Sequence, residues 1–265
     1  MTTMTMVLRV TTAIAALAVA GPALAHMPYV APGMFEIGTR DKVSIEASFT
    51  EDAFRPEIAM QDAPFEITGP DGKVTRLGVP LLLADRTLVE AAVPVDGVYR
   101  LSSGQRLGRM GKMYRDGAAW KMVGEDGPAP AGAETVAVQS TTLADAYVLR
   151  GKPKGLGALA PRGKALEIHP LTDPTGYAAA APASFEILFD GKPLATAEVT
   201  LWREAGLYDG RKQVAEVKSD ALGKLAVTPP DAGRYLLLVR HRAAAPAGSA
   251  APFYSYTVTL AFEAG

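Results

Sequence analysis

The sequence predicts an all-β protein made of two β-sandwich domains. Two observations carry this prediction: short runs in which apolar and polar residues alternate, and turn sequences rich in Gly, Pro and Asp between those runs. No segment shows the sustained apolar period of an amphipathic helix. The chain has 265 residues, which is long enough for two domains of ordinary size.

The first 25 residues predict a secretory signal peptide. Their one charged residue, Arg9, precedes an apolar run, and the segment ends in an A-x-A cleavage site at Ala25. The apolar run is shorter than the roughly 20 residues that span a bilayer. We therefore expect a mature periplasmic chain that begins at His26 and has no transmembrane segment.

Composition excludes several classes of function. The sequence contains 27 basic and 28 acidic residues, for a formal net charge of -1, so no nucleic-acid partner is predicted. It contains no cysteine, which excludes disulfides, thiolate metal sites and cysteine nucleophiles. The two domains must therefore be held by their buried apolar cores.

Residues 26–124 predict the first sandwich. In the run DKVSIEASF, apolar and polar residues alternate from Val43 to Phe49, as in a strand with one buried face. Three turn sequences predict hairpins, namely GPDG at residues 69–72, VDG at residues 95–97 and DG at residues 116–117.

Residues 125–163 are expected to form a linker that contains one strand, Thr135–Arg150. The segments on either side of that strand are rich in Pro, Gly and Ala, as in flexible connections. Residues 164–265 then return to alternating runs with Asp-Gly and Pro-Asp turns. They predict the second sandwich, a small Greek key.

Four stretches of the sequence, FEITGPDGK, ALEIHPLTDP, FEILFDGKPLATAEVTL and SDALGKLAVTPPDAGRYLL, resemble the periplasmic proteins of domain-of-unknown-function family 4198. That family is similar to periplasmic accessory proteins of nickel or cobalt uptake. The stretches LFDGKPLATAEVTL and DAGRYLL are shared in outline with transthyretin-like and carboxypeptidase-regulatory-like sandwiches. The resemblance therefore implies immunoglobulin-like or transthyretin-like sandwiches.

The same resemblance implies an exported protein without enzymatic activity, associated with metal uptake through a membrane transporter or an outer-membrane receptor. The family often places a histidine at the mature N-terminus, and here His26 matches. Relatives commonly continue with another histidine or tryptophan, whereas this chain continues with Met27, Pro28 and Tyr29.

His26 is the first candidate metal ligand. At a free N-terminus its α-amine and imidazole Nδ1 form a chelate, and the amine, with a pKa near 8, releases its proton readily at neutral pH. Pro28 is the third mature residue and has no amide proton, so the amino-terminal copper and nickel motif with histidine at position three is absent. Further ligands must come from elsewhere in the fold.

The acidic segment FTEDAFRPEI follows the first strand and is the nearest source of oxygen ligands. Mixed nitrogen and oxygen ligation suits nickel, cobalt, zinc or iron better than Cu(I), although nitrogen ligands also bind Cu(II). The predicted metal ligands are His26, Glu46, Glu51, Asp52, Glu57 and His241, with the identity of the ion left open.

Two other functions remain open at this point. A copper histidine-brace enzyme would need a second histidine facing His26, and the chain offers only His169 and His241. A sandwich without metal would bind carbohydrate or another envelope protein, for example through the aromatic residues of FYSY. The sequence contains no G-x-S-x-G, H-E-x-x-H or Walker motif, so we expect no enzyme.

Overall fold

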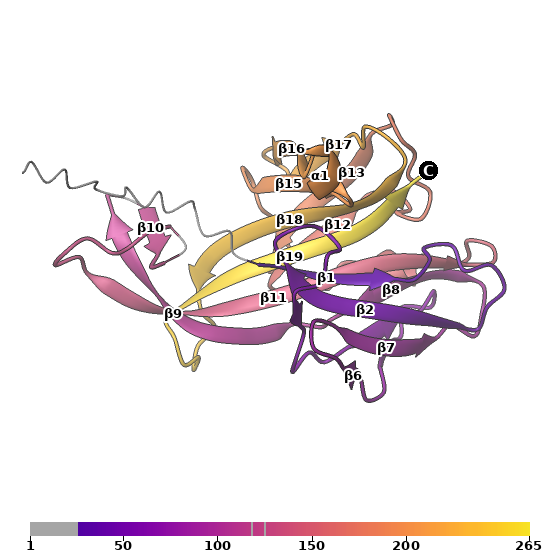
Figure 1. Cartoon of the computed structure of the whole chain (residues 1–265), viewed down its shortest axis with the longest axis horizontal. Coiled ribbons are helices and arrows are strands. Elements are labelled where there is room, and N and C mark those ends of the chain that lie inside the picture. The colour runs from indigo at the N-terminus through magenta and orange to yellow at the C-terminus, as the bar shows by residue number, and fades with distance from the viewer. Residues whose placement is uncertain (1–25, 118, 125) are drawn as a thin grey trace, which may run out of the picture.

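The computed structural model describes residues 26–117, 119–124 and 126–265 (Figure 1). Almost all regular structure in these ranges is β-strand; a 3-10 helix, η1 (Gly157–Leu159), and a single-turn helix, α1 (Gly206–Asp209), interrupt it. The all-β prediction is confirmed. The predicted signal peptide, residues 1–25, lies outside the described residues. Neither helix in the described ranges has the length and apolarity needed to cross a membrane.

The described strands form three sheets. The N-terminal sheet has the order β1 (Met27–Pro32), β2 (Lys42–Thr50), β7 (Thr87–Ala92), β6 (Leu81–Leu82), with β3 (Ile58–Ala59) beside β2. The central sheet has the order β16 (Gln213–Lys218), β15 (Glu198–Arg203), β18 (Gly233–Ala244), β19 (Phe253–Ala264), β11 (Thr135–Arg150), β8 (Gly97–Ser102), β4 (Glu66–Thr68), β5 (Val74–Arg76), with β9 (Arg106–Asp116) beside β11 and β10 (Ala119–Met122) beside β9. The C-terminal sheet contains β12 (Leu166–Pro170), β13 (Ala183–Phe189), β14 (Lys192–Pro193) and β17 (Lys224–Val227).

Whereas β5, β9, β10 and β16 are mostly exposed or half-buried, the middle of the central sheet is buried on both faces. Strand β18 shows this directly, because successive residues point to opposite faces of a sheet. Leu236 and Leu238 belong to the core shared with the N-terminal sheet, whereas Leu237 and Val239 belong to the core shared with the C-terminal sheet. The molecule is therefore a stack of three β-layers with one hydrophobic core on each side of the middle layer (Figure 1).

Strand β11 begins and ends at the predicted residues, Thr135 and Arg150. It pairs in parallel with β19 and antiparallel with β8 and β9. The central sheet therefore takes strands from residues 26–124, from residues 125–163 and from residues 164–265. The division into two domains stays a prediction, and the structure adds that both sandwiches share this sheet as a common layer.

Two of the three predicted hairpins are confirmed, since β4 pairs with β5 and β9 pairs with β10. The hairpin predicted around residues 95–97 is wrong, because β7 lies in the N-terminal sheet and β8 in the central sheet. Val89 and Ala91 of β7 and Tyr99 and Leu101 of β8 enter the same core from opposite sides. The alternation of apolar and polar residues predicts only that each strand buries one face. Two strands in different sheets that face each other across a core show the same alternation as two strands paired in a hairpin.

A buried ion pair ties the segment after β11 to the central sheet. Arg162 donates to both carboxylate oxygens of Asp145 on β11, at 2.6 and 2.9 Å, and to the Ser102 hydroxyl of β8 at 2.9 Å. Burial raises the pKa of Asp145, but the charge and hydrogen bonds of Arg162 outweigh it and hold that pKa below its usual value. The carboxylate therefore stays charged inside the protein.

Removing one partner of this pair should destabilise the protein strongly. We expect Arg162→Met to lower the free energy of unfolding by about 3–5 kcal/mol, because Asp145 is left charged and buried without its partner. The double variant Asp145→Leu/Arg162→Met should recover part of that loss, since neither partner of the pair is left charged and buried alone, although the buried Arg100 also loses the nearby charge of Asp145. Urea denaturation of the three proteins measures both effects, and a double variant no more stable than Arg162→Met would contradict this account.

Candidate metal site

Strand register brings three of the predicted ligands together at the end of β2. Strand β1 pairs with β2 so that Met27 lies opposite Thr50, which places His26 next to Glu51. On the other side of β2, β3 pairs Ile58 with Phe49, which places Glu57 next to Thr50. The pairing of β1 on one side of β2 and of β3 on the other side thus places His26 and Glu57 at the same end of β2.

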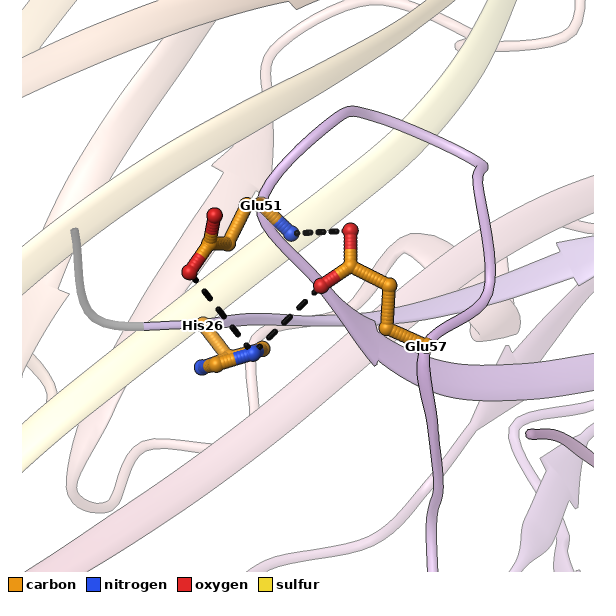
Figure 2. Close-up of side chains that lie close together, drawn as sticks. All are labelled: His26, Glu51 and Glu57. Atoms are coloured by element: carbon orange, nitrogen blue, oxygen red, sulfur yellow. Dashed lines mark hydrogen bonds and ion pairs between the residues drawn. The ribbon is translucent and has the colours of Figure 1, made fainter. Parts of the chain in front are cut away.

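The three side chains converge on one point (Figure 2). The imidazole Nε2 of His26 lies 3.4 Å from Glu57 Oε2 and 3.9 Å from Glu51 Oε1. One ligand atom from each of the three residues lies within 4.8 Å of the other two. Their side chains are 37% (His26), 51% (Glu51) and 31% (Glu57) exposed, so the cluster is open to solvent.

Glu57 is held in place by the backbone. Its Oε1 accepts a hydrogen bond from the Glu51 amide at 3.2 Å, which leaves Oε2 facing His26 (Figure 2). The Glu57 amide in turn donates to the Phe49 carbonyl at 3.2 Å. Outer contacts of this kind orient a carboxylate before any ligand arrives.

The loop between Glu51 and Glu57 is closed by the buried side chain of Thr50. The Thr50 hydroxyl accepts a hydrogen bond from the Asp52 amide at 3.0 Å and donates to the Arg55 carbonyl at 2.6 Å. The Arg55 amide donates to the Asp52 carbonyl at 2.9 Å. The loop therefore returns to β2 in a fixed turn, and its two glutamates end on the same side.

The donor set fits a divalent transition metal. Two ligands about 2.1 Å from one ion lie about 3.0 Å apart at octahedral angles and about 3.4 Å apart at tetrahedral angles. The separation of 3.4 Å between His26 and Glu57 already meets this requirement, and Glu51 at 3.9 Å needs a shift of roughly half an ångström. One imidazole nitrogen and two carboxylate oxygens favour nickel, cobalt, zinc or iron(II) over Cu(I).

The structure does not bring Glu46 into this cluster. Arg86 donates to Glu46 Oε2 at 2.7 Å, and the Tyr29 hydroxyl donates to Oε1. Burial and the hydrogen bond to Glu46 both raise the pKa of Tyr29, so this hydroxyl keeps its proton. Glu46 points from the outward-facing row of β2 toward these two partners, several residues before the strand end where His26 lies.

Asp52 and His241 are also engaged elsewhere. Asp52 forms ion pairs with Lys212 and, at 3.8 Å, with Arg55, because the turn after Glu51 directs its side chain toward the C-terminal half. His241 lies on β18 with its ring 4.7 Å from the ring of Phe189, at the end of the second core. The sequence suggested both residues as ligands because of their chemistry, but it did not show where their side chains point. In the structure, Asp52 and His241 contact partners away from His26.

A groove of about 520 Å³ opens beside His26, and the sequence analysis did not single out its residues. Its floor consists of the central-sheet residues Ser140, Thr142, Ser255 and Thr257, and Arg106 and Arg109 of β9 line it as well. The signal in the sequence is the alternation of hydroxyl residues in QSTTL and YSYTV, which marks a polar face where a buried strand would be apolar.

The comparison with protein families settles the family. A family model described as "Domain of unknown function (DUF4198)" matches residues 23–243. The chain belongs to this family. The DUF4198 match begins before His26, covers the candidate metal site and most of the C-terminal half, and ends before Ser255 and Thr257 of the groove. No curated protein matches the DUF4198 chain.

Several solved structures resemble the DUF4198 chain at low identity. The D0-D1 domain of intimin is 12% identical, with 88% of this chain and 96% of that chain covered and a TM-score of 0.21. The adhesin InvE of Yersinia pseudotuberculosis is 14% identical, with 89% and 58% covered and a TM-score of 0.22. A DUF4785 family protein of Legionella pneumophila is 11% identical, with 80% and 51% covered and a TM-score of 0.26.

The position of His241 predicts a pH dependence of stability. Burial lowers the pKa of His241 from its ordinary value of 6.5. As the pH falls below about 6.5, the unfolded chain therefore takes up this proton before the folded protein does, and stability is lost. We expect His241→Phe to retain more of its neutral-pH stability at about pH 5 than the wild type does. Urea midpoints across this pH range measure the effect, and parallel profiles for the two proteins would refute it.

Proposed function

We propose that this protein is an exported periplasmic accessory factor that binds a divalent transition metal and passes it to a membrane transporter or an outer-membrane receptor. The observation that supports the proposal is the convergence of His26, Glu51 and Glu57 at the end of β2. Two independent strand pairings are needed to build this cluster.

The geometry favours ligation through Nε2 of His26. Nε2 is the ring atom that faces both carboxylates, so an ion bound there takes one nitrogen and two oxygens from the protein (Figure 2). The chelate expected at a free N-terminus uses Nδ1 and the α-amine, on the other side of the ring. One ion cannot use both sides of the ring, and Nε2 carries the additional ligands.

An accessory role suits this site better than permanent storage. Three protein ligands leave coordination positions for water or for a second ligand, as in metal sites that exchange. The partial exposure of all three side chains gives a recipient protein access to the ion. The resemblance of the family to proteins of nickel or cobalt uptake makes these two ions the first to test, with zinc, iron and copper next.

The two alternative functions receive less support. In the described residues, no second histidine joins the His26 cluster, because His169 lies 3.3 Å from Glu186 on the C-terminal sheet and His241 contacts Phe189. A copper histidine brace therefore lacks its second imidazole. A carbohydrate platform needs a group of exposed aromatic rings; Tyr208 is exposed, but Tyr254 and Tyr256 are buried.

Metal binding should stabilise the mature protein through this cluster. At a metal concentration roughly 100 times Kd, Ni²⁺ or Co²⁺ should raise the free energy of unfolding by about 2.7 kcal/mol. His26→Ala and the pair Glu51→Gln/Glu57→Gln should abolish that increase. Thermal denaturation with and without metal, together with isothermal titration calorimetry, measures both effects.

The matched control is Glu90→Gln/Glu198→Gln, which removes two exposed carboxylates paired with Lys42 and Lys218 on other strands. This control should bind metal as the wild type does. Equal metal binding by the control and by Glu51→Gln/Glu57→Gln would mean that any bound ion sits elsewhere.

The position of His26 in the mature chain can be checked directly. We expect the intact mass of protein exported with its own leader to match a chain that begins at His26. It should retain metal after dialysis, and a His26→Ala variant should retain none. A longer N-terminus with unchanged metal content would show that Nε2 binds without a free amine, whereas equal metal content in wild type and His26→Ala would contradict the proposed function.

A further inference from the structure

The groove beside His26 has a floor that is built to meet a polar ligand. Strands β11 and β19 run in parallel with Ser140 opposite Ser255 and Thr142 opposite Thr257, so these four hydroxyl side chains lie on one face of the central sheet. Farther along the same face, Ala144 and Ala261 lie under the N-terminal sheet, in the first core. The floor turns polar at the end of β1 where His26 lies.

Some of this polarity has no partner within the protein. The Thr142 Oγ1 is buried, yet it has no hydrogen-bond partner among the described residues. A buried hydroxyl without a partner costs free energy, and such groups are rare unless something else satisfies them. Thr142 lines the groove, so this unpartnered hydroxyl lies just beneath the floor that a ligand would contact.

The groove also carries two arginines, Arg106 and Arg109, that form no ion pair among the described residues. Arg106 lies over the ring of Phe49, with its Cζ 5.3 Å from the ring centroid, and its Nε donates to the Gln61 carbonyl at 2.5 Å. Arg109 is exposed. Asp62 lines the groove as well and places one carboxylate beside the two arginines.

A stacked arginine and a free arginine beside a row of hydroxyls form a site for a carboxylate-bearing ligand. Guanidinium groups pair with carboxylates through two parallel hydrogen bonds, and hydroxyls accept or donate to the remaining oxygens. The groove volume of about 520 Å³ accommodates a small organic acid. His26 lines this groove and also faces Glu51 and Glu57, so it joins the groove to the metal site.

We propose that the groove binds a small polycarboxylate, and that this molecule reaches the protein as the organic part of a metal chelate. Its ion sits on His26, Glu51 and Glu57, and its free carboxylates pair with Arg106 and Arg109. The polycarboxylate supplies ligand atoms for the coordination positions of the ion that the three protein side chains leave open. This inference rests on the proposed function, since it names the form in which the metal is bound.

The test compares Ni²⁺ alone with Ni²⁺ in excess citrate, a tricarboxylate that chelates it, using the mature protein in isothermal titration calorimetry. The wild type should bind the nickel–citrate complex at least about tenfold more tightly than Ni²⁺ alone, as charge-assisted hydrogen bonds predict. Arg106→Gln/Arg109→Gln should lose that advantage and should bind Ni²⁺ alone within about twofold of the wild type. The single variant Arg109→Gln should lose part of this affinity advantage, and this variant leaves the contacts of Arg106 intact.

The matched control is Lys73→Gln/Arg76→Gln, on the β4–β5 hairpin, which removes the same charge and lies in a different groove. It should bind the complex as the wild type does. Binding of the complex that is no tighter than binding of Ni²⁺, or equal loss in the control, overturns the polycarboxylate groove and leaves the metal site standing. Failure of the wild type to bind nickel in either form overturns this inference, and failure to bind cobalt, zinc, iron and copper as well overturns the proposed function.

Discussion

The parallel pairing of β11 with β19 is the constraint on which the rest of the structure depends. It joins residues 138–146 to residues 253–261 and places these two strands in the middle of the central sheet. Where both faces of that sheet are covered, its strands are apolar on both sides, as "YLLLV" of the neighbouring β18 shows, and β11 and β19 turn polar on one face where they form the groove floor. Both outer sheets then pack on a layer that neither half of the chain makes alone.

The fold class could be predicted from the sequence because strand formation leaves a local signal. The alternation from Val43 to Phe49 and the strand predicted at Thr135–Arg150 both match strands that the structure contains. The sequence of a strand carries no comparable local signal for the sheet that the strand joins. β7 and β8 show the reason, since each buries one face in the same core whether the strands pair or face each other. The shared central sheet was therefore not predicted, although nearly all of its strands were.

The candidate site was predictable to the extent that its residues are close in sequence. Glu51 and Glu57 stand in one acidic loop, and a histidine directly after a predicted cleavage site is visible in the sequence alone. Glu46 and Asp52 have the same chemistry, but Arg86 and Lys212, which lie far along the chain, engage them. The hydroxyl floor and its arginines come from three strands, so only the register of the central sheet shows that they form one surface.

The place of β19 in the sheet also bears on the order in which the chain can fold. β19 ends at Ala264, one residue before the last residue of the sequence, and it contributes to both cores. Neither core can close until this strand has been synthesised, so contacts distant in sequence dominate and folding is slow. The export that we propose would suit this topology, because a chain that folds slowly stays unfolded longer. β19 also lies beside β1 through the hydrogen bond from the Thr259 hydroxyl to the Pro28 carbonyl, so the last strand supports the segment that carries His26.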